Sequence, residues 1–339
     1  MPAPGEALLI KLWETIADKG IGSLLRPWQI RREGRANVDN KRSELLVLAQ
    51  TERDVAAIRR GEMHGGVNGI LADTPQLLPA PPVDAALELV PLSLPNYEDV
   101  ARRNAAADSV QREVRLAKAI IYAEEELAQD GAMPSATPVS DDWLYRWRDC
   151  AASVSSEDLQ SVWGKVLAGE VKAPGRFSLR TLEFVRNLSQ SEAAVIERLS
   201  PFVIENMVHR VADTALGAAG IDFGTLLSLQ ELGVLAGVDG LGLEISWKSI
   251  DPSSFVQALK SHGRVLVIKA PDQTKVLKLP ARALTAIGRQ VLQLGTFQPN
   301  ESYLREVGEA IKTQGFSVEI GTYLLAGESG IRVFGAEQL

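Results

Sequence analysis

The sequence predicts a mainly α-helical protein with a smaller α+β part in its C-terminal half, and an N-terminal long-helix hairpin or coiled-coil-like region. Apolar residues recur at three- and four-residue spacing over most of the first two thirds of the chain, which is the pattern of amphipathic helices. Serine, aspartate, glycine and proline stand where such helices would begin and end. Runs typical of strands occur only from Leu243 onward.

The front of the chain supplies the long helices. We expect a short helix over residues 6–18, a long helix from Trp28 to Arg60 ended by Gly61, and a second long helix from about Tyr97 to Gln129. The apolar face of the second long helix is wide and rich in small residues, so it needs more than one partner helix. The two long helices could pair within one chain or across an oligomer.

Residues 63–95 separate the two long helices. This segment has six prolines and no lysine or arginine, yet it keeps many leucines and valines. A disordered tether would be more polar, so we expect an apolar, extended arm that lies on the protein itself or on a neighbouring subunit. The predicted organisation is N-terminal helices over 1–62, the arm over 63–95, the long helix over 96–131 and a helical to α+β domain over 139–339.

Arginine and apolar residues stand side by side near the start of the first long helix. This composition is typical of a helix at a membrane interface. It also suits a helix whose arginine stems cover the apolar surface of a partner protein. Packing helices are the commoner case, so we prefer partner contact and leave membrane contact as the alternative. The predicted contact residues are Leu24, Leu25, Arg26, Trp28, Ile30, Arg31 and Arg32.

The most specific local signals lie in the middle of the chain. Trp163 belongs to an apolar helical stripe that Ser155 or Ser156 can cap and that Gly169 is expected to end. Pro174-Gly175 then makes a turn. Two further short helices follow, one opened by Ser178 with Leu179 on its core face, and one opened by a capping box of Ser189 and Glu192.

This block resembles an uncharacterised family of bacterial proteins. The resemblance is carried by a Trp, then Leu-Ala-Gly-Glu, then Pro-Gly-x-Phe-Ser-Leu-Arg-Thr-Leu, over residues 163–182. Because that family has no agreed activity, the resemblance implies a bacterial, cytoplasmic-type protein and no mechanism. The motif residues, which we interpret as structural, are Trp163, Gly169, Glu170, Pro174, Gly175, Phe177, Ser178 and Arg180.

Two charged residues of the motif also allow a functional interpretation. Glu170 and Arg180 stand beside sharp turns, where they could bind a ligand or take part in catalysis. Turns and helix ends need charged groups at such places. The preferred interpretation is therefore that both residues satisfy turn amides and helix termini.

The C-terminal half mixes helices and strands. Helices are expected over 202–215, 226–235, 284–292 and 300–314, strands over 243–247, 265–269 and 275–279, and edge strands over 316–325 and 331–334. We expect the strands over 265–269 and 275–279 to form a hairpin. This order is similar to a winged-helix module, so the domain is predicted to be winged-helix-like. Residues 178–295 hold twelve basic and eleven acidic residues, whereas a DNA-reading module usually has a basic excess.

Composition narrows the function further. The formal net charge of −7 gives no overall attraction to nucleic acid or to an anionic membrane. The single cysteine, Cys150, fits a reducing compartment. No run of about eighteen apolar residues occurs. We expect a cytoplasmic protein, with peripheral membrane association left open.

Familiar catalytic signatures are missing from the sequence. His64, His209 and His262 are scattered, and neither a P-loop nor a Gly-x-Ser-x-Gly elbow occurs. We therefore expect no cofactor, no metal and no catalytic residue.

The function that we prefer is a non-enzymatic bacterial binding or assembly protein, homo-oligomeric and with a protein partner. A sensor or adaptor role in phage defence or stress response is the setting that we suggest. The alternatives are a winged-helix DNA-binding transcription regulator, a peripheral membrane protein and an enzyme with an unfamiliar site.

Overall fold

The computed structural model describes residues 5–17, 19–21, 39–60, 62–66, 69–72, 97–239, 243–326 and 330–339, without the side chains of 39–46, 63–72 and 326. The chain divides into two compact units, Met1–Phe177 and Ser178–Leu339. We expected a boundary over residues 131–138. The structure places it later, because the helices that follow this linker pack on the long helix that precedes it.

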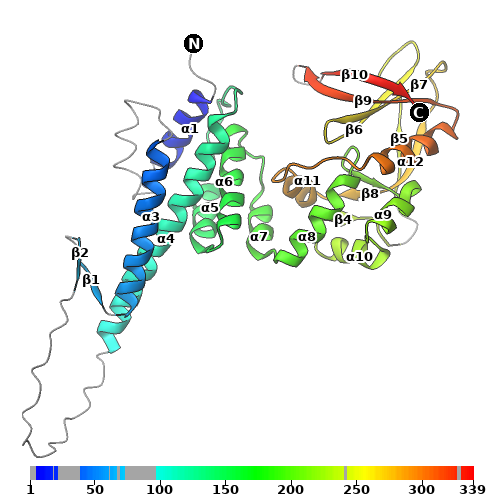
Figure 1. Cartoon of the computed structure of the whole chain (residues 1–339). Helices are drawn as coiled ribbons and strands as arrows, with labels where there is room; N and C mark the ends of the chain where they lie inside the picture. Colours follow the sequence, from blue (N-terminus) through cyan, green and yellow to red (C-terminus); the bar gives the residue numbers. More distant parts are fainter. Residues whose placement is uncertain are drawn as a thin grey trace, which may run out of the picture. The chain divides into compact units, whose positions relative to one another are not determined.

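Unit 1 is built around one long central helix (Figure 1). This helix, α4, spans Tyr97–Ala128, close to its predicted bounds. Four helices pack against it: α1 (Glu6–Ala17), α3 (Asp39–Arg60), α5 (Asp141–Ser153) and α6 (Glu157–Lys172). The two long helices α3 and α4 thus pair within one chain, where Val55 and Ile58 of α3 meet Ala107 and Val110 of α4.

The apolar face of α4 is covered inside a single subunit. Val114, Leu116, Ala117, Ile120 and Leu127 are each at most 1% exposed. The wide face therefore needs several partner helices, as predicted, but α1, α3, α5 and α6 of the same chain supply them. Of the two pairings left open by the sequence, the one within a single chain is therefore the one observed for these helices.

Part of the predicted arm has regular structure. β1 (Met63–Gly66) and β2 (Gly69–Ala72) pair as an antiparallel hairpin. The start of the segment is therefore not an extended arm. Residues 73–96, which hold the rest of the arm, lie outside the described residues, as do residues 28–38 of the first predicted long helix.

Unit 2 begins with helices and a first sheet. The helices are α7 (Leu179–Asn187), α8 (Gln190–Leu199), α9 (Asp213–Ala218) and α10 (Phe223–Glu231), with short 3₁₀ turns at Ser200–Phe202 and Arg210–Ala212. The sheet is antiparallel in the order β3-β8-β4, and β5 also pairs with β8. Its strands are β3 (Met207–His209), β4 (Leu235–Ala236), β5 (Leu243–Trp247) and β8 (Leu277–Leu284).

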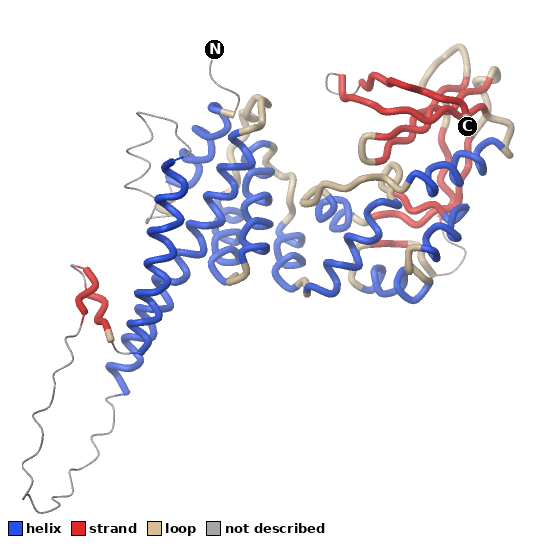
Figure 2. Tube along the Cα trace, viewed as in Figure 1, coloured by secondary structure: helices blue, strands red, loops and turns tan. Residues whose placement is uncertain are grey.

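A second antiparallel sheet has the order β10-β9-β7-β6 (Figure 2). Its strands are β6 (Phe255–Ser261), β7 (Arg264–Ala270), β9 (Ser317–Ala326) and β10 (Gly330–Gln338). Helix α12 (Glu301–Lys312) packs on β9, while α11 (Ala286–Leu292) contacts α7. Val307, Ile311, Val318 and Ile320 are at most 1% exposed and form part of the core between α12 and this sheet.

Three predictions for unit 2 are wrong. No continuous helix spans residues 202–215, because Glu205 and Asn206 turn the chain with positive φ angles of 48° and 63° into β3. The strands β7 and β8 form no hairpin either. β7 pairs with β9 and with the unpredicted β6, and a turn at His262 and Gly263, both with positive φ, joins β6 to β7. The strand expected at the edge over 316–325 is β9, which lies between two others.

Candidate functional site

Two indole hydrogen bonds hold the motif helix in unit 1. The Nε1–H of Trp147 on α5 donates to the backbone carbonyl of Trp163 on α6 at 2.9 Å. The Nε1–H of Trp143 donates to the carbonyl of Phe177 at 2.7 Å. All four residues are at most 4% exposed. A buried indole needs an acceptor for its one donor, so these contacts fix α5 against α6 and against the turn that follows it.

The carboxylate of Glu170 organises that turn. Its Oε1 accepts from the backbone N–H of Gly175 at 2.6 Å, and its Oε2 accepts from the N–H of Phe177 at 3.0 Å. Burial raises the pKa of this carboxyl, while the backbone donors act in the opposite direction. The interpretation of Glu170 as a residue that satisfies turn amides is therefore confirmed.

Gly169 does not end its helix. α6 continues to Lys172, and Gly169 lies inside it, where an added Cβ would come within 2.6 Å of Cε2 of the Phe177 ring. Gly169 thus serves close packing instead of termination. Pro174-Gly175 forms the predicted turn, and the φ of 87° at Gly175 explains the glycine there.

The end of the motif belongs to unit 2. Ser178 caps α7 through its Oγ, which accepts from the N–H of Thr181. The side-chain oxygen Oε1 of Gln290 on α11 accepts hydrogen bonds from the Thr181 hydroxyl and from the Ser178 N–H. Arg180 is exposed and has no hydrogen bond or ion pair with any described residue, so its predicted role at a helix end is wrong. Leu179, predicted to be core, is 46% exposed.

Two features of unit 1 escaped the sequence analysis. Gly164 lets α6 approach α4, since an added Cβ would lie 2.5 Å from the Cβ of Tyr122. Lys118 of α4 is 9% exposed and forms a 2.7 Å ion pair with Glu52 of α3. A glycine within an apolar helical stripe was a usable signal for the first feature. The second depends on a contact between distant segments.

The predicted partner or membrane contact residues lie outside the described residues. They are Leu24, Leu25, Arg26, Trp28, Ile30, Arg31 and Arg32. No helix in the described part of the chain combines the length and the apolar composition that crossing a membrane requires.

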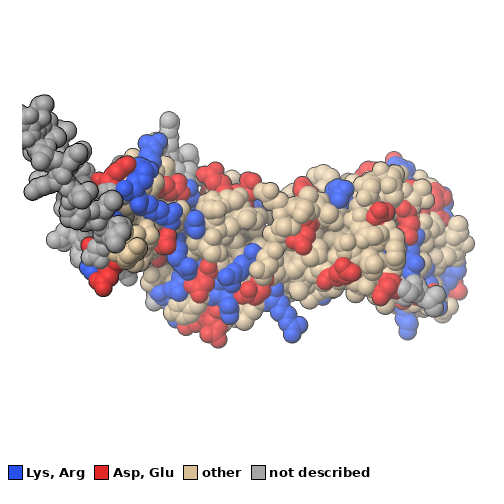
Figure 3. Space-filling view, turned by 90° about the horizontal axis from the view of Figure 1, so that it is seen from below, with Lys and Arg blue, Asp and Glu red and all other residues tan. Residues whose placement is uncertain are grey.

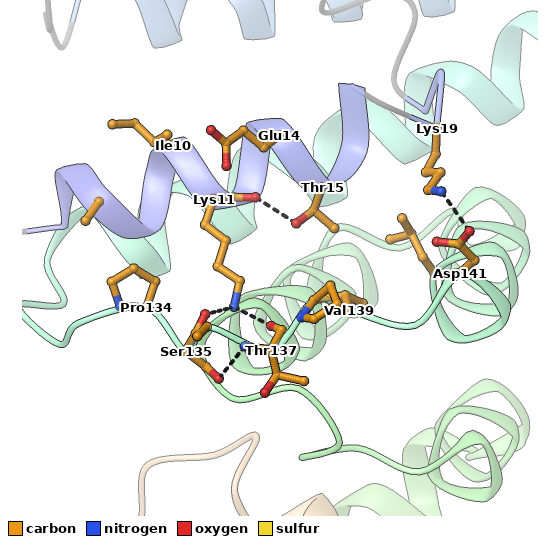
Figure 4. Close-up of a pocket in the computed structure, with 14 residues that line it drawn as sticks. Ile10, Lys11, Glu14, Thr15, Lys19, Pro134, Ser135, Thr137, Val139 and Asp141 are labelled. Carbon is orange, nitrogen blue, oxygen red and sulfur yellow. Dashed lines mark hydrogen bonds and ion pairs between the residues drawn. The ribbon is translucent and has the colours of Figure 1, made fainter.

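A depression of about 680 Å³ lies between α1 and the linker after α4 (Figure 4). Lys11 extends from α1 across it, and its Nζ donates to the backbone carbonyls of Ser135 at 2.7 Å and Thr137 at 3.0 Å. Partial burial lowers the pKa of Lys11. The Lys19 ammonium pairs with the carboxylate of Asp141 at 2.7 Å. Lys11 therefore ties the linker to α1, and Lys19, which follows α1, ties that end of the helix to the start of α5. Both cations are used in structural contacts, so the depression is a structural contact more than a ligand site.

A buried polar cluster lies in unit 2. His209 on β3 is fully buried, and neither of its ring nitrogens has a hydrogen-bond partner among the described residues. Its backbone N–H donates to the hydroxyl of Tyr303 at 2.5 Å. Burial lowers the pKa of His209 to about 4, so the ring is neutral near pH 7. Arg282 and Asp213 form a bidentate ion pair, with Arg282 only 3% exposed.

These groups do not converge on a reacting centre. Within the described ranges, no group of three or more His, Cys, Asp or Glu residues could hold a metal ion. On the face drawn in Figure 3, lysine and arginine side chains are intermingled with aspartate and glutamate, and uncharged residues cover much of the remaining surface.

One comparison with known proteins bears on the motif. A family described as Protein of unknown function (DUF2806) matches residues 101–210. This match runs from α4 to the start of the 3₁₀ turn at Arg210 and contains the whole motif block. An uncharacterised domain family is therefore supported over this segment. No curated protein and no solved structure matches the chain.

Proposed function

We propose that this protein is a non-enzymatic bacterial binding and assembly protein, and that unit 2 is a contact module with a winged-helix-like arrangement. The arrangement is supported by chain order. α8, β3, α9, α10, β4 with β5, and β8 follow one another as the helices and strands of such a module do, and β8 lies between β3 and β4. Between β5 and β8 the chain inserts β6 and β7, which join the second sheet.

The observation that carries the proposal is the outer surface of α10. In a helix-turn-helix arrangement the second helix of the pair presents its outer face to the partner, and α10 follows α9 in that position. Its sequence contains no lysine or arginine, and its exposed residues are Phe223, at 58%, with Gly224, Ser228 and Glu231. Exposed aromatic side chains are enriched in protein interfaces. A protein partner therefore suits this helix.

DNA binding is the second candidate, because the topology favours it. The charge of α10 opposes it, since affinity for DNA depends mainly on cations that neutralise phosphates. The net charge of −7 adds no general attraction. A gel-shift titration at low salt decides this point. If the wild type binds duplex DNA and the Phe223→Asp variant does not, the function of α10 is DNA recognition and not contact with a protein partner.

Affinity isolation of the full chain from bacterial cells tests the proposal. Co-purified protein, lipid and nucleic acid are all quantified for the wild type, for Phe223→Asp and for the control Ile250→Asp. Ile250 is 68% exposed but lies in the loop after β5. A discrete protein that the wild type and the control retain, and that Phe223→Asp loses, supports the proposal. Equal recovery by all three variants would reject α10 as the contact surface.

The biological setting is part of the proposal. A bacterial sensor or adaptor in phage defence or stress response is the role that we suggest. The resemblance of residues 163–182 to an uncharacterised bacterial family supports the bacterial setting and names no process. Leu24 to Arg32 remains a proposed second contact, with protein preferred to a membrane surface. Flotation with anionic liposomes, comparing the wild type with a Trp28→Glu, Arg31→Glu variant, tests the membrane alternative.

A further inference from the structure

We propose that a second copy of this chain docks on the edge strand β10, so that the β10-β9-β7-β6 sheets of two subunits join edge to edge about a two-fold axis. This inference rests on the proposed assembly function and names the surface that performs it. Four observations support it: an open edge, exposed apolar residues, self-complementary charges and an aromatic residue at the two-fold axis.

β10 is the open edge of its sheet. It pairs only with β9, so its other side presents backbone N–H and C=O groups without a strand partner among the described residues. The opposite edge, β6, is covered by its own chain. The N–H of Glu205 donates to the carbonyl of Lys260 at 2.9 Å, and the N–H of Ile250 donates to the carbonyl of Val256 at 3.0 Å. Extension of this sheet is therefore favoured at β10.

The β9–β10 hairpin exposes apolar side chains, whereas edge strands of monomers usually carry charges or proline. Leu324 is 62% exposed, Leu325 77%, Val333 36% and Phe334 49%. The strand register places Leu324 and Phe334 on one face of the sheet and Leu325 and Val333 on the other, so both faces of the hairpin carry exposed apolar residues. Burial of such side chains is the main favourable contribution to association.

The charges of β10 select one register for a symmetric pair. A two-fold axis requires that if residue i of one copy faces residue j of the other, then j also faces i. Pairing Arg332 with Glu337 of the second copy therefore forms the same ion pair twice. The partners of these residues on β9 are Leu324 and Ile320, an even number of positions apart, so Arg332 and Glu337 lie on one face of the sheet.

The surroundings of both charges agree with this register. Glu337 already bonds Arg305 of α12 at 2.9 Å, and a second arginine would leave its carboxylate between two cations. Arg332 is exposed and has no ion-pair partner among the described residues. A register that centres on Arg332 instead would place two arginines opposite each other, which is unfavourable.

The same register places Phe334 at the two-fold axis. Phe334 pairs with Thr322, which lies midway between Leu324 and Ile320, the partners of Arg332 and Glu337. The extra residue of the bulge between Phe334 and Glu337 is present in both copies, so the Phe334 residues of the two copies lie opposite each other. Aromatic cross-strand pairs of this kind stabilise strand pairing.

A charge exchange on the full chain tests the interface. Mass is measured by light scattering over a micromolar concentration series for Arg332→Glu, Glu337→Arg, the double variant that combines both changes, and the control Lys248→Glu, an exposed charge in the loop after β5. We expect a dimer for the wild type and the control, at least tenfold weaker dimerisation for each single variant, and recovery in the double variant. Phe334→Lys should also dissociate the dimer, and circular dichroism verifies that each variant is folded.

Three results would overturn the inference. They are a monomeric wild type at every concentration, single variants that dimerise like the wild type, and a double variant that stays as weak as the single ones while remaining folded. A dimer that β10 variants leave intact would place self-association elsewhere and keep the proposed function. The isolation experiment on α10 tests that function independently, because Phe223 lies outside this interface.

Discussion

Trp147 and Trp163 are joined by a 2.9 Å hydrogen bond from the indole N–H of the first to the backbone carbonyl of the second. The contact connects α5 to α6 inside unit 1, and both rings are at most 1% exposed. The motif that resembles an uncharacterised family therefore has a physical explanation. Its Trp163 and Phe177 carbonyls accept from the two indoles of α5, its Gly169 allows Phe177 to pack against α6, and its Glu170 closes the turn that follows α6.

Trp147→Ala should destabilise unit 1 severely. It removes a fully buried side chain and the indole donor, and such truncations cost about 3–5 kcal/mol of unfolding free energy. Denaturant unfolding followed by far-ultraviolet circular dichroism measures the change. Tyr145→Ala on the same helix is the control, because Tyr145 is 40% exposed and should change stability far less. Equal losses in both variants would contradict the role of the Trp147 contact.

Glu170→Ala should weaken the turn after α6. The N–H groups of Gly175 and Phe177 lose their acceptor, which costs roughly 1–3 kcal/mol when buried donors are left unpaired. Glu126→Ala, at an exposed site on α4, is the matched control. Denaturation midpoints at pH 7 measure both changes, and a loss no larger than that of the control would show that Glu170 does not hold the turn.

The raised pKa of Glu170 also predicts a pH dependence. Because burial raises the pKa in the folded state above the unfolded value of 4.5, the folded state holds this proton more tightly. The contribution of this group to stability is therefore complete below the unfolded pKa and is lost as pH rises through the folded pKa. When the free energy of unfolding is measured at a series of pH values above 4, the Glu170→Gln variant should not show this loss of stability.

His209 should make unit 2 sensitive to acid. Its pKa falls from 6.5 to about 4 in the folded state, so the unfolded state binds more protons between these values. Stability is retained above pH 6.5 and is lost as pH falls toward 4, by about 3 kcal/mol at 1.36 kcal/mol for each unit of pKa. His209→Phe should flatten this part of the profile, while His262→Gln should keep it. An unchanged slope in His209→Phe would contradict the prediction.

Gly164→Ala should disrupt the contact between α4 and α6. The added Cβ would lie 2.5 Å from the Cβ of Tyr122 and 2.9 Å from the carbonyl oxygen of Ala119, so the helices must separate, at roughly 1–3 kcal/mol. Gly131→Ala is the control, because an added Cβ there meets nothing within 4 Å. Thermal unfolding compares the two, and a stabilised Gly164→Ala variant would contradict the close packing.

The sequence predicts elements well where local chemistry decides them. The expected helix from Tyr97 to Gln129 differs from α4 by one residue at its end. The caps at Ser178 and at Ser189 with Glu192 form as predicted, because each depends on residues three positions apart. The turn amides beside Glu170 belong to the same class of local signal.

Pairings between distant segments could not be predicted in this way. β7 joins β9 rather than β8, and that choice depends on packing against α12 more than on any neighbouring residue. Lys118 and Glu52 are 66 positions apart, so neither residue indicates the other. For the same reason, the open edge at β10 could be recognised only once the strand order was known.

Light scattering on the unmodified full chain tests most directly the central claim, which is that this protein is built to associate. The account predicts a mass that rises with concentration from 36.7 kDa toward twice that value in the micromolar range. A mass that stays at 36.7 kDa throughout this range would contradict it.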